Sequence, residues 1–271
     1  MKEFLENLEK SLISFETGSK ELNQFLQNFV SAKGKKIRPK LAYLCIKANN
    51  QNISSKQLKL ISAGELLHAA SLIHDDIIDD ATYRRGMEVL HKLYNHKIAV
   101  ITGDFLASIA LEKIQKLENF EIQTMFLNTF NKMCKAELSQ YFERGNYPSI
   151  ENYLEKSTNK TAELFGTILK GVMLLNSKEI SDKAYTLGLH YGRAFQIKND
   201  LEAFLTTNSE DKTNKTYTAP DIFINQGLNK ISAIEKTKDL IDNEKKLAIS
   251  TLTIFADNQY KHELRALIEG L

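Results

Sequence analysis

An acidic segment preceded by apolar residues is the part of this sequence with the clearest potential for chemistry. It reads His-Asp-Asp-Ile-Ile-Asp-Asp over residues 74–80. If residues 60–78 form a helix, its polar positions recur every three or four residues on one stripe, at His68, Ser71, Asp75 and Asp79. Carboxylates one turn apart repel each other unless a cation binds between them, and oxygen ligands favour Mg²⁺, which often also binds substrate phosphates. The alternative is a solvated acidic helix end, which the apolar residues before the motif disfavour.

Basic residues lie near predicted helix ends, where they could bind phosphates that such a metal ion bridges. The three groups are Lys35, Lys36 and Arg38; Arg84 and Arg85; and Lys160 with Thr161. Gly34 ends one predicted helix and the next restarts after Pro39, so the first group lies at a joint. Guanidinium groups can hold diphosphate oxygens, and a Lys-Thr pair at the start of an apolar helix suits phosphate. Taken alone, the first group is equally consistent with a solvated turn, and the Lys-Thr pair is weak evidence by itself.

A second polar stripe occurs on an apolar helix near residue 200. Its polar members are Gln196, Asn199 and Asp200, and its apolar neighbours are Ala194, Phe195, Ile197 and Leu201. Two helices of this kind suggest the facing walls of a cavity.

The composition favours one nearly all-helical domain over residues 1–271. Hydrophobic residues make up 42% of the chain, enough for a substantial core, and only three prolines interrupt it. The net charge of +2 gives no reason to expect a nucleic-acid partner. Two cysteines without a disulfide framework favour the cytoplasm, and we expect neither a signal peptide nor a membrane span. The polar segment 206–220 is the longest loop candidate, and such loops are often lids.

The order and spacing of these motifs resemble the trans-polyprenyl diphosphate synthases, and most closely their long-chain, octaprenyl-type branch. The matching motifs are Gly34 to Pro39, Glu65 to His68, Asp75 to Asp79, Arg84 to Gly86, Gly103-Asp104, Lys160 to Ala162 and Phe195-Gln196. The resemblance implies an all-α, single-domain bundle of about ten or more helices around a deep central cavity, usually as a homodimer. It also implies that Mg²⁺ assists ionisation of an allylic diphosphate, which isopentenyl diphosphate then attacks head-to-tail.

The same resemblance assigns roles by position. The metal ligands would be Asp75, Asp76, Asp79, Asn199 and Asp200. Isopentenyl diphosphate would be held by Lys35, Arg38, His68 and Arg85, and the allylic diphosphate by Arg84, Lys160, Thr161 and Gln196. The residues closest to the reaction would be Asp75, Asp79, Lys160, Gln196 and Asp200.

The second aspartate motif departs from the family pattern Asp-Asp-x-x-Asp. It reads Asn-Asp-Leu-Glu-Ala over residues 199–203, so two of three carboxylates are missing. We expect weaker binding of a third magnesium ion, because a neutral ligand attracts Mg²⁺ less than a carboxylate does. A catalytically weak partner subunit of a heteromeric synthase is therefore one alternative. A terpene cyclase is a poorer one, because cyclases would want Ser or Thr at Ala203 and have no use for a second diphosphate site.

Two small residues precede the first aspartate motif, at the positions that limit product length in the family. They are Ala70 and Ser71, where aromatic side chains would stop the growing tail early. The resemblance therefore implies a long-chain product of the kind used for quinone side chains. The alternative is a short-chain farnesyl or geranylgeranyl diphosphate synthase, in which a bulky residue deeper in the cavity closes the floor.

Overall fold

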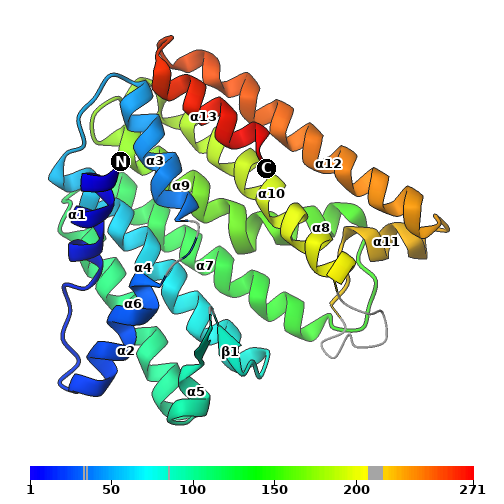
Figure 1. The fold of residues 1–271 in the computed structure, drawn as a ribbon, viewed down its shortest axis with the longest axis horizontal. Coiled ribbons are helices and arrows are strands. Elements are labelled where there is room, and N and C mark those ends of the chain that lie inside the picture. The colour runs from blue at the N-terminus through cyan, green and yellow to red at the C-terminus, as the bar shows by residue number, and fades with distance from the viewer. Residues whose placement is uncertain (33, 35, 85, 207–215) are drawn as a thin grey trace. The chain divides into compact units, whose positions relative to one another are not determined.

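Helices form nearly all of the regular structure of the computed structural model, which confirms the all-α prediction (Figure 1). The structure describes residues 1–271 except Lys33, Lys35, Arg85 and residues 207–215. The chain forms two compact units. Unit 1 comprises Met1–Lys47 and Gln51–Leu127, and unit 2 comprises Ala48–Asn50 and Asn128–Leu271. A single domain around a central cavity stays a prediction, and most of the predicted lid lies outside the described residues.

Unit 1 is built around a long central helix. Its elements are α1 (Lys2–Leu12), α2 (Lys20–Ser31), α3 (Ile37–Ala48), α4 (Ser55–Ile78), β1 (Tyr83–Arg84), β2 (Met87–Glu88), α5 (Leu90–Leu93), α6 (His96–Gln115) and the start of α7 (Phe120–Phe142). Ser54 and Gln57 form a capping box that fixes the start of α4. Helix α4 packs against α1 and α6. A Cβ atom at Gly103 of α6 would lie 2.2 Å from Nε2 of His74, so a larger residue there would force the His74 imidazole to move.

The start of α3 differs from the prediction. The helix begins at Ile37, before Pro39 rather than after it. Proline is tolerated here because the first backbone N–H groups of a helix have no partner within the helix.

Unit 2 contains the remaining helices. They are the rest of α7, then α8 (Ile150–Ser157), η1 (Thr158–Ala162), α9 (Glu163–Leu174), η2 (Lys178–Ile180), α10 (Ser181–Thr206), α11 (Ala219–Asn225), α12 (Lys230–Ser250), η3 (Thr251–Ile254) and α13 (Gln259–Glu269). Helix α10 packs against η1, α9 and α12. A Cβ atom at Gly192 would lie 2.5 Å from Cα of Ala162, so the small residue lets α10 approach η1 closely.

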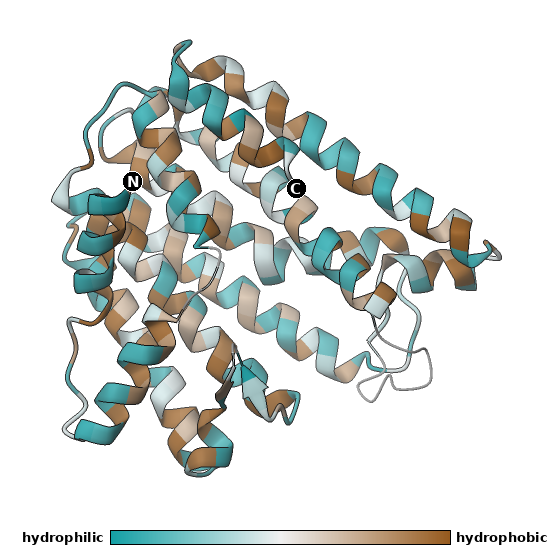
Figure 2. Ribbon diagram, in the orientation of Figure 1, coloured by the Kyte–Doolittle hydropathy of each residue, from teal (hydrophilic) through white to brown (hydrophobic). Residues whose placement is uncertain are grey.

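Helix α12 is amphipathic. Teal and brown residues alternate along it in Figure 2. Its buried residues recur every three or four positions, as one face of a helix requires: Ala233, Thr237, Ile241, Glu244 and Ala248. Within the described part of the chain, no helix combines the length and the apolar character that crossing a bilayer requires.

Candidate functional site

The first aspartate motif lies at the C-terminal end of α4. Asp75 is half-buried and Asp79 is exposed, whereas Asp76 is buried with 3% of its surface exposed. The backbone N–H of Asp79 donates to the carbonyl of Asp75 at 2.9 Å. Asp80 then adopts a φ of 47°, the left-handed conformation that often ends a helix. This turn leaves Asp75 and Asp79 where a cation can reach them, and leads the chain into the β1–β2 hairpin.

The buried Asp76 holds Arg84 in place. Nε of Arg84, on β1, donates to Oδ1 of Asp76 at 2.5 Å. Burial raises the pKa of Asp76, while the guanidinium group of Arg84 opposes that rise. The Arg84 side chain keeps 31% of its surface exposed, so it can still face a ligand. Metal binding by Asp76 stays a prediction, but the structure gives this carboxylate a second role, as the anchor of Arg84.

The expected isopentenyl diphosphate residues can be placed only in part. Lys35 and Arg85 lie outside the described residues. Arg38 is half-buried in the first turn of α3, and His68 is half-buried on α4. Lys36, two residues before Arg38, has a φ of 44°, and its Nζ donates to the carbonyl of Val30 at 2.6 Å.

The two residues expected to limit product length lie on different sides of α4. Ala70 is buried, with 1% of its surface exposed. Ser71 is half-buried, and its hydroxyl donates to the carbonyl of His68 at 2.9 Å. Because that hydroxyl is bound to its own helix, Ser71 presents a small and largely satisfied side chain.

In unit 2, hydrogen bonds connect three of the predicted residues. Thr161 donates to Oε1 of Gln196 at 2.7 Å, and Nε2 of Gln196 donates to Oδ1 of Asp200 at 2.8 Å. Tyr153 of α8 donates to the second carboxylate oxygen of Asp200 at 2.6 Å. We call these four residues the Asp200 network. The sequence analysis missed Tyr153, because no local pattern signals a contact between residues 47 apart.

Burial sets the protonation of Asp200. It raises the pKa of this carboxyl group to about 6, although Tyr153, Gln196 and Lys160 act in the opposite direction. Tyr153 shows the matching effect, because its own burial and the nearby Asp200 raise the pKa of its hydroxyl. By accessible surface Asp200 and Asn199 are both half-buried, whereas Glu202 and Ala203 are exposed.

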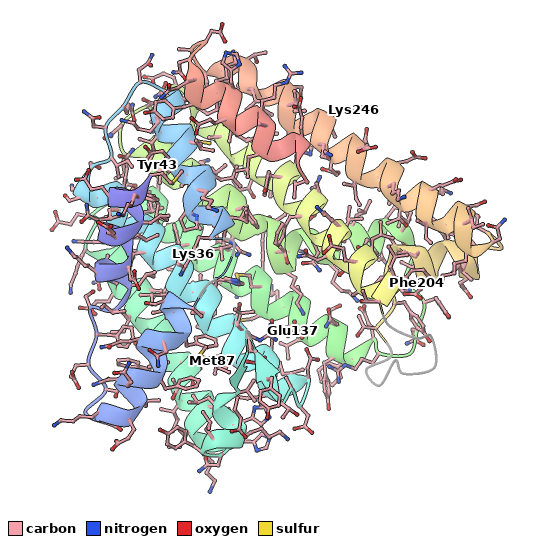
Figure 3. All side chains as sticks on the ribbon, viewed as in Figure 1. Lys36, Tyr43, Met87, Glu137, Phe204 and Lys246 are labelled. Atoms are coloured by element: carbon pink, nitrogen blue, oxygen red, sulfur yellow. The ribbon has the colours of Figure 1, made fainter. Side chains whose placement is uncertain are left out.

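Lys160 lies on a π-helical turn, η1, and pairs with an acid that the sequence analysis did not select. Its Nζ lies 2.6 Å from Oε2 of Glu137 on α7 (Figure 3) and 3.5 Å from Oε1 of Gln140. Glu137 and Gln140 are three residues apart on α7 and so share one face, but nothing in that spacing points to Lys160. A π-helical turn within a helix is frequent at functional sites.

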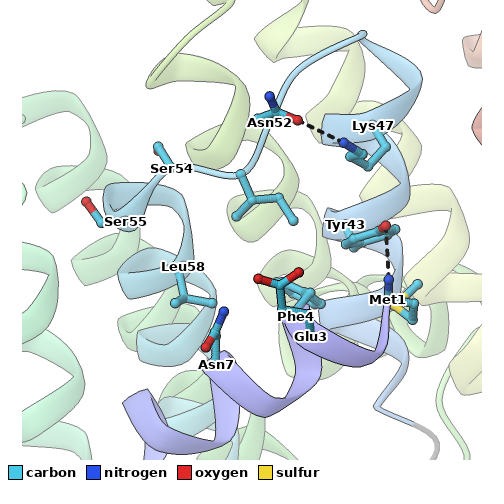
Figure 4. Close-up of a pocket in the computed structure, with 11 residues that line it drawn as sticks. Met1, Glu3, Phe4, Asn7, Tyr43, Lys47, Asn52, Ser54, Ser55 and Leu58 are labelled. Carbon is cyan, nitrogen blue, oxygen red and sulfur yellow. Dashed lines mark hydrogen bonds between the residues drawn. The ribbon is translucent and has the colours of Figure 1, made fainter.

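A separate pocket of unit 1 contains none of the predicted site residues. It has a volume of about 330 Å³ and lies between α1, α3 and the start of α4 (Figure 4). The backbone nitrogen of Met1 donates to the Tyr43 hydroxyl at 3.1 Å, and Lys47 Nζ donates to Oδ1 of Asn52 at 3.1 Å. Among the residues that line it, this pocket has two ammonium groups, those of Met1 and Lys47, and the single carboxylate of Glu3, so it does not suit a magnesium diphosphate.

Comparison with known proteins identifies the family. The sequence profile of the polyprenyl synthetase family matches residues 19–247, which include both aspartate motifs and the π-helical turn. The chain belongs to the polyprenyl synthetase family. This result confirms the resemblance seen in the sequence motifs.

Relatives and a solved structure agree with that assignment. A prenyl transferase of Cyanidium caldarium is 34% identical over 207 residues, which cover 74% of this chain and 64% of the relative. Solanesyl-diphosphate synthase 2 of Oryza sativa subsp. japonica, a chloroplastic protein, is 29% identical over 89% of this chain and 61% of its own length. The chain thus spans just under two thirds of these relatives. A Caulobacter crescentus polyprenyl synthase, solved with calcium and isoprenyl diphosphate, shares the fold with a TM-score of 0.89 and 20% identity, covering 99% of this chain and 94% of that one.

Proposed function

We propose that this chain is a trans-polyprenyl diphosphate synthase, which adds isopentenyl diphosphate to an allylic diphosphate. The observation that carries the proposal is the end of α4, where Asp75 and Asp79 are accessible one turn apart and Asp76 anchors Arg84. Two carboxylates beside a positioned guanidinium group suit a metal-bound diphosphate, because the metal and the arginine both neutralise phosphate oxygens. Membership of the polyprenyl synthetase family supports the same reaction.

The donor groups fit magnesium. Asp75 and Asp79 offer carboxylate oxygens only, the ligands that a hard cation such as Mg²⁺ prefers. In unit 1 we assign them as metal ligands, with Asp76 beside them, and in unit 2 we assign Asn199 and Asp200 of the second motif as metal ligands. When bound, the ion would neutralise charge that develops on the departing diphosphate. The Caulobacter relative was solved with calcium, another oxygen-binding divalent ion, which supports a divalent-metal site.

The chain's own side chains then have to bind and orient the allylic diphosphate. We assign this task to Arg84 in unit 1, and to Lys160, Thr161 and Gln196 in unit 2. Lys160 contributes a positive charge that Glu137 holds at 2.6 Å, so the ammonium group is already positioned before a diphosphate arrives. Thr161 is held by its hydrogen bond to Gln196, and it can redirect this donor to a phosphate oxygen. No side-chain nucleophile is needed, because ionisation of the carbon–oxygen bond generates the electrophile.

A long-chain product is the second part of the proposal. Ala70 is small and buried, and the hydroxyl of Ser71 is bound to its own helix, so neither side chain projects a bulky group. The rice relative is named for a solanesyl product, which supports this assignment. The alternative, a farnesyl or geranylgeranyl product, would need a larger residue elsewhere to stop elongation.

We further propose that the chain acts as a homodimer in the cytoplasm. Exposed apolar residues on α6 support a buried interface: Ile98, Val100 and Ile101 are 36%, 42% and 64% exposed. Cys45 and Cys134 are free, which suits a reducing compartment. Light scattering on the purified chain tests the dimer, and replacing Ile101 with Asp should shift the mass toward the monomer.

A catalytically weak subunit is the second candidate, and the altered second motif favours it. Ala203 offers no ligand, and Asn199 offers only a neutral one. This candidate predicts binding of both diphosphates without product, and activity once a partner chain is added.

A product assay distinguishes the two candidates. The purified chain is incubated with Mg²⁺, radiolabelled isopentenyl diphosphate and an allylic primer, and the dephosphorylated products are resolved by length. The active synthase predicts long products that vanish in the Asp75→Asn variant, whereas Asn7→Ser, in the separate pocket of unit 1, serves as a matched control. Binding of both diphosphates without any product would instead favour the weak subunit.

A further inference from the structure

Two histidines and a carboxylate meet beside the β1–β2 hairpin, outside the residues assigned to the diphosphate reaction. Ligand atoms of Asp80, His91 and His96 all lie within 4.8 Å of one another. Nε2 of His91 is 3.5 Å from Oδ1 of Asp80, and the two imidazole rings lie 5.0 Å apart between centroids. We call these three residues the two-histidine cluster, and all of them belong to unit 1.

The burial of His91 is the second, independent observation. The side chain of His91 is fully buried, with 0% of its surface exposed. Among the described residues neither ring nitrogen makes a hydrogen bond of good geometry, and the carboxylate of Asp80 lies 3.5 Å from Nε2. Buried polar atoms are normally paired, because an unpaired one loses its hydration without compensation. A ligand that accepts the Nε2 lone pair would remove this cost.

The chemistry of the cluster selects a transition metal rather than magnesium. Two imidazole nitrogens and one carboxylate oxygen are ligands of Zn²⁺ and similar ions, whereas Mg²⁺ prefers oxygen alone. Zinc bonds to such atoms are about 2.0–2.1 Å long, so tetrahedral ligand atoms lie ~3.3 Å apart. Asp80 and His96 are both exposed, and rotation of their side chains can close the remaining gap around the fixed His91.

One cation already competes for the cluster. Nζ of Lys92 lies 2.7 Å from Oδ1 of Asp80, and its side chain is about one third exposed. A metal ion would have to displace this ammonium group or use the other carboxylate oxygen. Removing Lys92 should therefore strengthen metal binding, because the carboxylate of Asp80 is then free of its ammonium partner.

We propose that Asp80, His91 and His96 bind one divalent transition-metal ion of the Zn²⁺ class. Asp80 follows α4, and His91 and His96 follow β2, so the ion would join the two ends of the segment that carries Arg84. It would restrict the hairpin without touching the proposed magnesium ligands Asp75 and Asp79. The inference does not depend on the proposed reaction.

Zinc binding to the full chain tests the proposal. Affinity is measured by competition with a fluorescent chelator, in excess Mg²⁺ so that oxygen-only sites are filled. Asp80→Asn and His96→Gln alter exposed side chains and should leave the fold intact. The matched control is His262→Gln, which alters an exposed histidine 3.4 Å from Asp257; among the described residues this pair belongs to no group of three potential ligands.

We expect one Zn²⁺ per chain, with affinity falling ~10-fold or more in Asp80→Asn and His96→Gln, and unchanged in His262→Gln. Lys92→Met should raise the affinity about two- to fivefold, as removal of an exposed ionic competitor predicts. Bound Co²⁺ should show stronger visible absorption in the wild type than in His96→Gln. Equal affinities in all variants, or a loss of zinc binding in Asp75→Asn alone, would overturn the proposal.

Discussion

The raised pKa of Asp200 predicts an unusual dependence of stability on pH. The folded-state pKa is about 6, against 3.8 for the free side chain. Between these values the folded chain binds a proton that the unfolded chain does not, so this group makes the protein more stable as pH falls through 6. From pH 7.5 to pH 5.0, the linkage relation gives about 1 kcal/mol of added unfolding free energy.

Other groups titrate over the same range, so the measurement is a difference between two proteins. Urea unfolding is recorded in metal-free buffer for the wild type and Asp200→Asn at both pH values. The wild type should gain about 1 kcal/mol relative to the variant on going from pH 7.5 to pH 5.0. Glu202→Gln, which removes an exposed carboxylate two residues further along α10, is the control for loss of charge itself.

Replacing Tyr153 tests the direction in which its hydrogen bond shifts the pKa of Asp200. Its hydroxyl donates to Asp200 and stabilises the ionised form, so Tyr153→Phe should raise the pKa of Asp200 further. The gain in unfolding free energy should then begin at a higher pH in Tyr153→Phe than in the wild type. If the wild type and Asp200→Asn keep a constant stability difference across this range, the burial argument for Asp200 is wrong.

Three further predictions follow from contacts within the two units. Gly192→Ala should lower the unfolding free energy by ~1–3 kcal/mol, because a Cβ atom there would lie 2.5 Å from a Cα atom of η1. Urea titration measures this loss, and an unchanged midpoint would contradict the close approach of α10 to η1. Arg84→Met should cost ~1–3 kcal/mol, because it leaves Asp76 buried without its cation, and calorimetry would detect the lower melting temperature. Restoring acids in Asn199→Asp with Ala203→Asp should raise turnover at low magnesium, and an unchanged rate would mean that other groups already supply those ligands.

The sequence predicts the parts of the site that depend on local periodicity. The polar stripe on residues 60–78 lies on α4 as expected, and the Asp75–Asp79 spacing places both acids where a cation can reach them. The predicted start of α3 is wrong. Proline favours the first position of a helix but is tolerated throughout the first turn, so Pro39 does not mark where the helix begins.

Contacts between distant segments could not be predicted in the same way. Asp200 receives a hydrogen bond from Tyr153, and Lys160 pairs with Glu137, across 47 and 23 residues of sequence. No sequence periodicity indicates either contact, because both depend on how whole helices pack against each other. The burial of Asp76 could be predicted in part. Successive residues of a helix are about 100° apart around its axis, so the residue after Asp75 points toward the apolar side of α4, but its pairing with Arg84 depends on the hairpin that follows.

The π-helical turn η1 has a consequence for how this chain can evolve. One extra residue in a turn shifts the angular phase of everything before it relative to everything after it. Helix α9 is buried almost all round, from Glu163 to Leu169, so its packing tolerates little change. Thr161 and Ala162 of η1 are buried as well, and Ala162 lies against Gly192 of α10, so the same packing fixes η1 and α9. Deleting one residue of η1 would rotate the preceding helix α8 by about 100° around the helix axis while α9 stays in place, and Tyr153 on α8 would then no longer reach Asp200. A one-residue deletion in this turn should therefore be tolerated poorly.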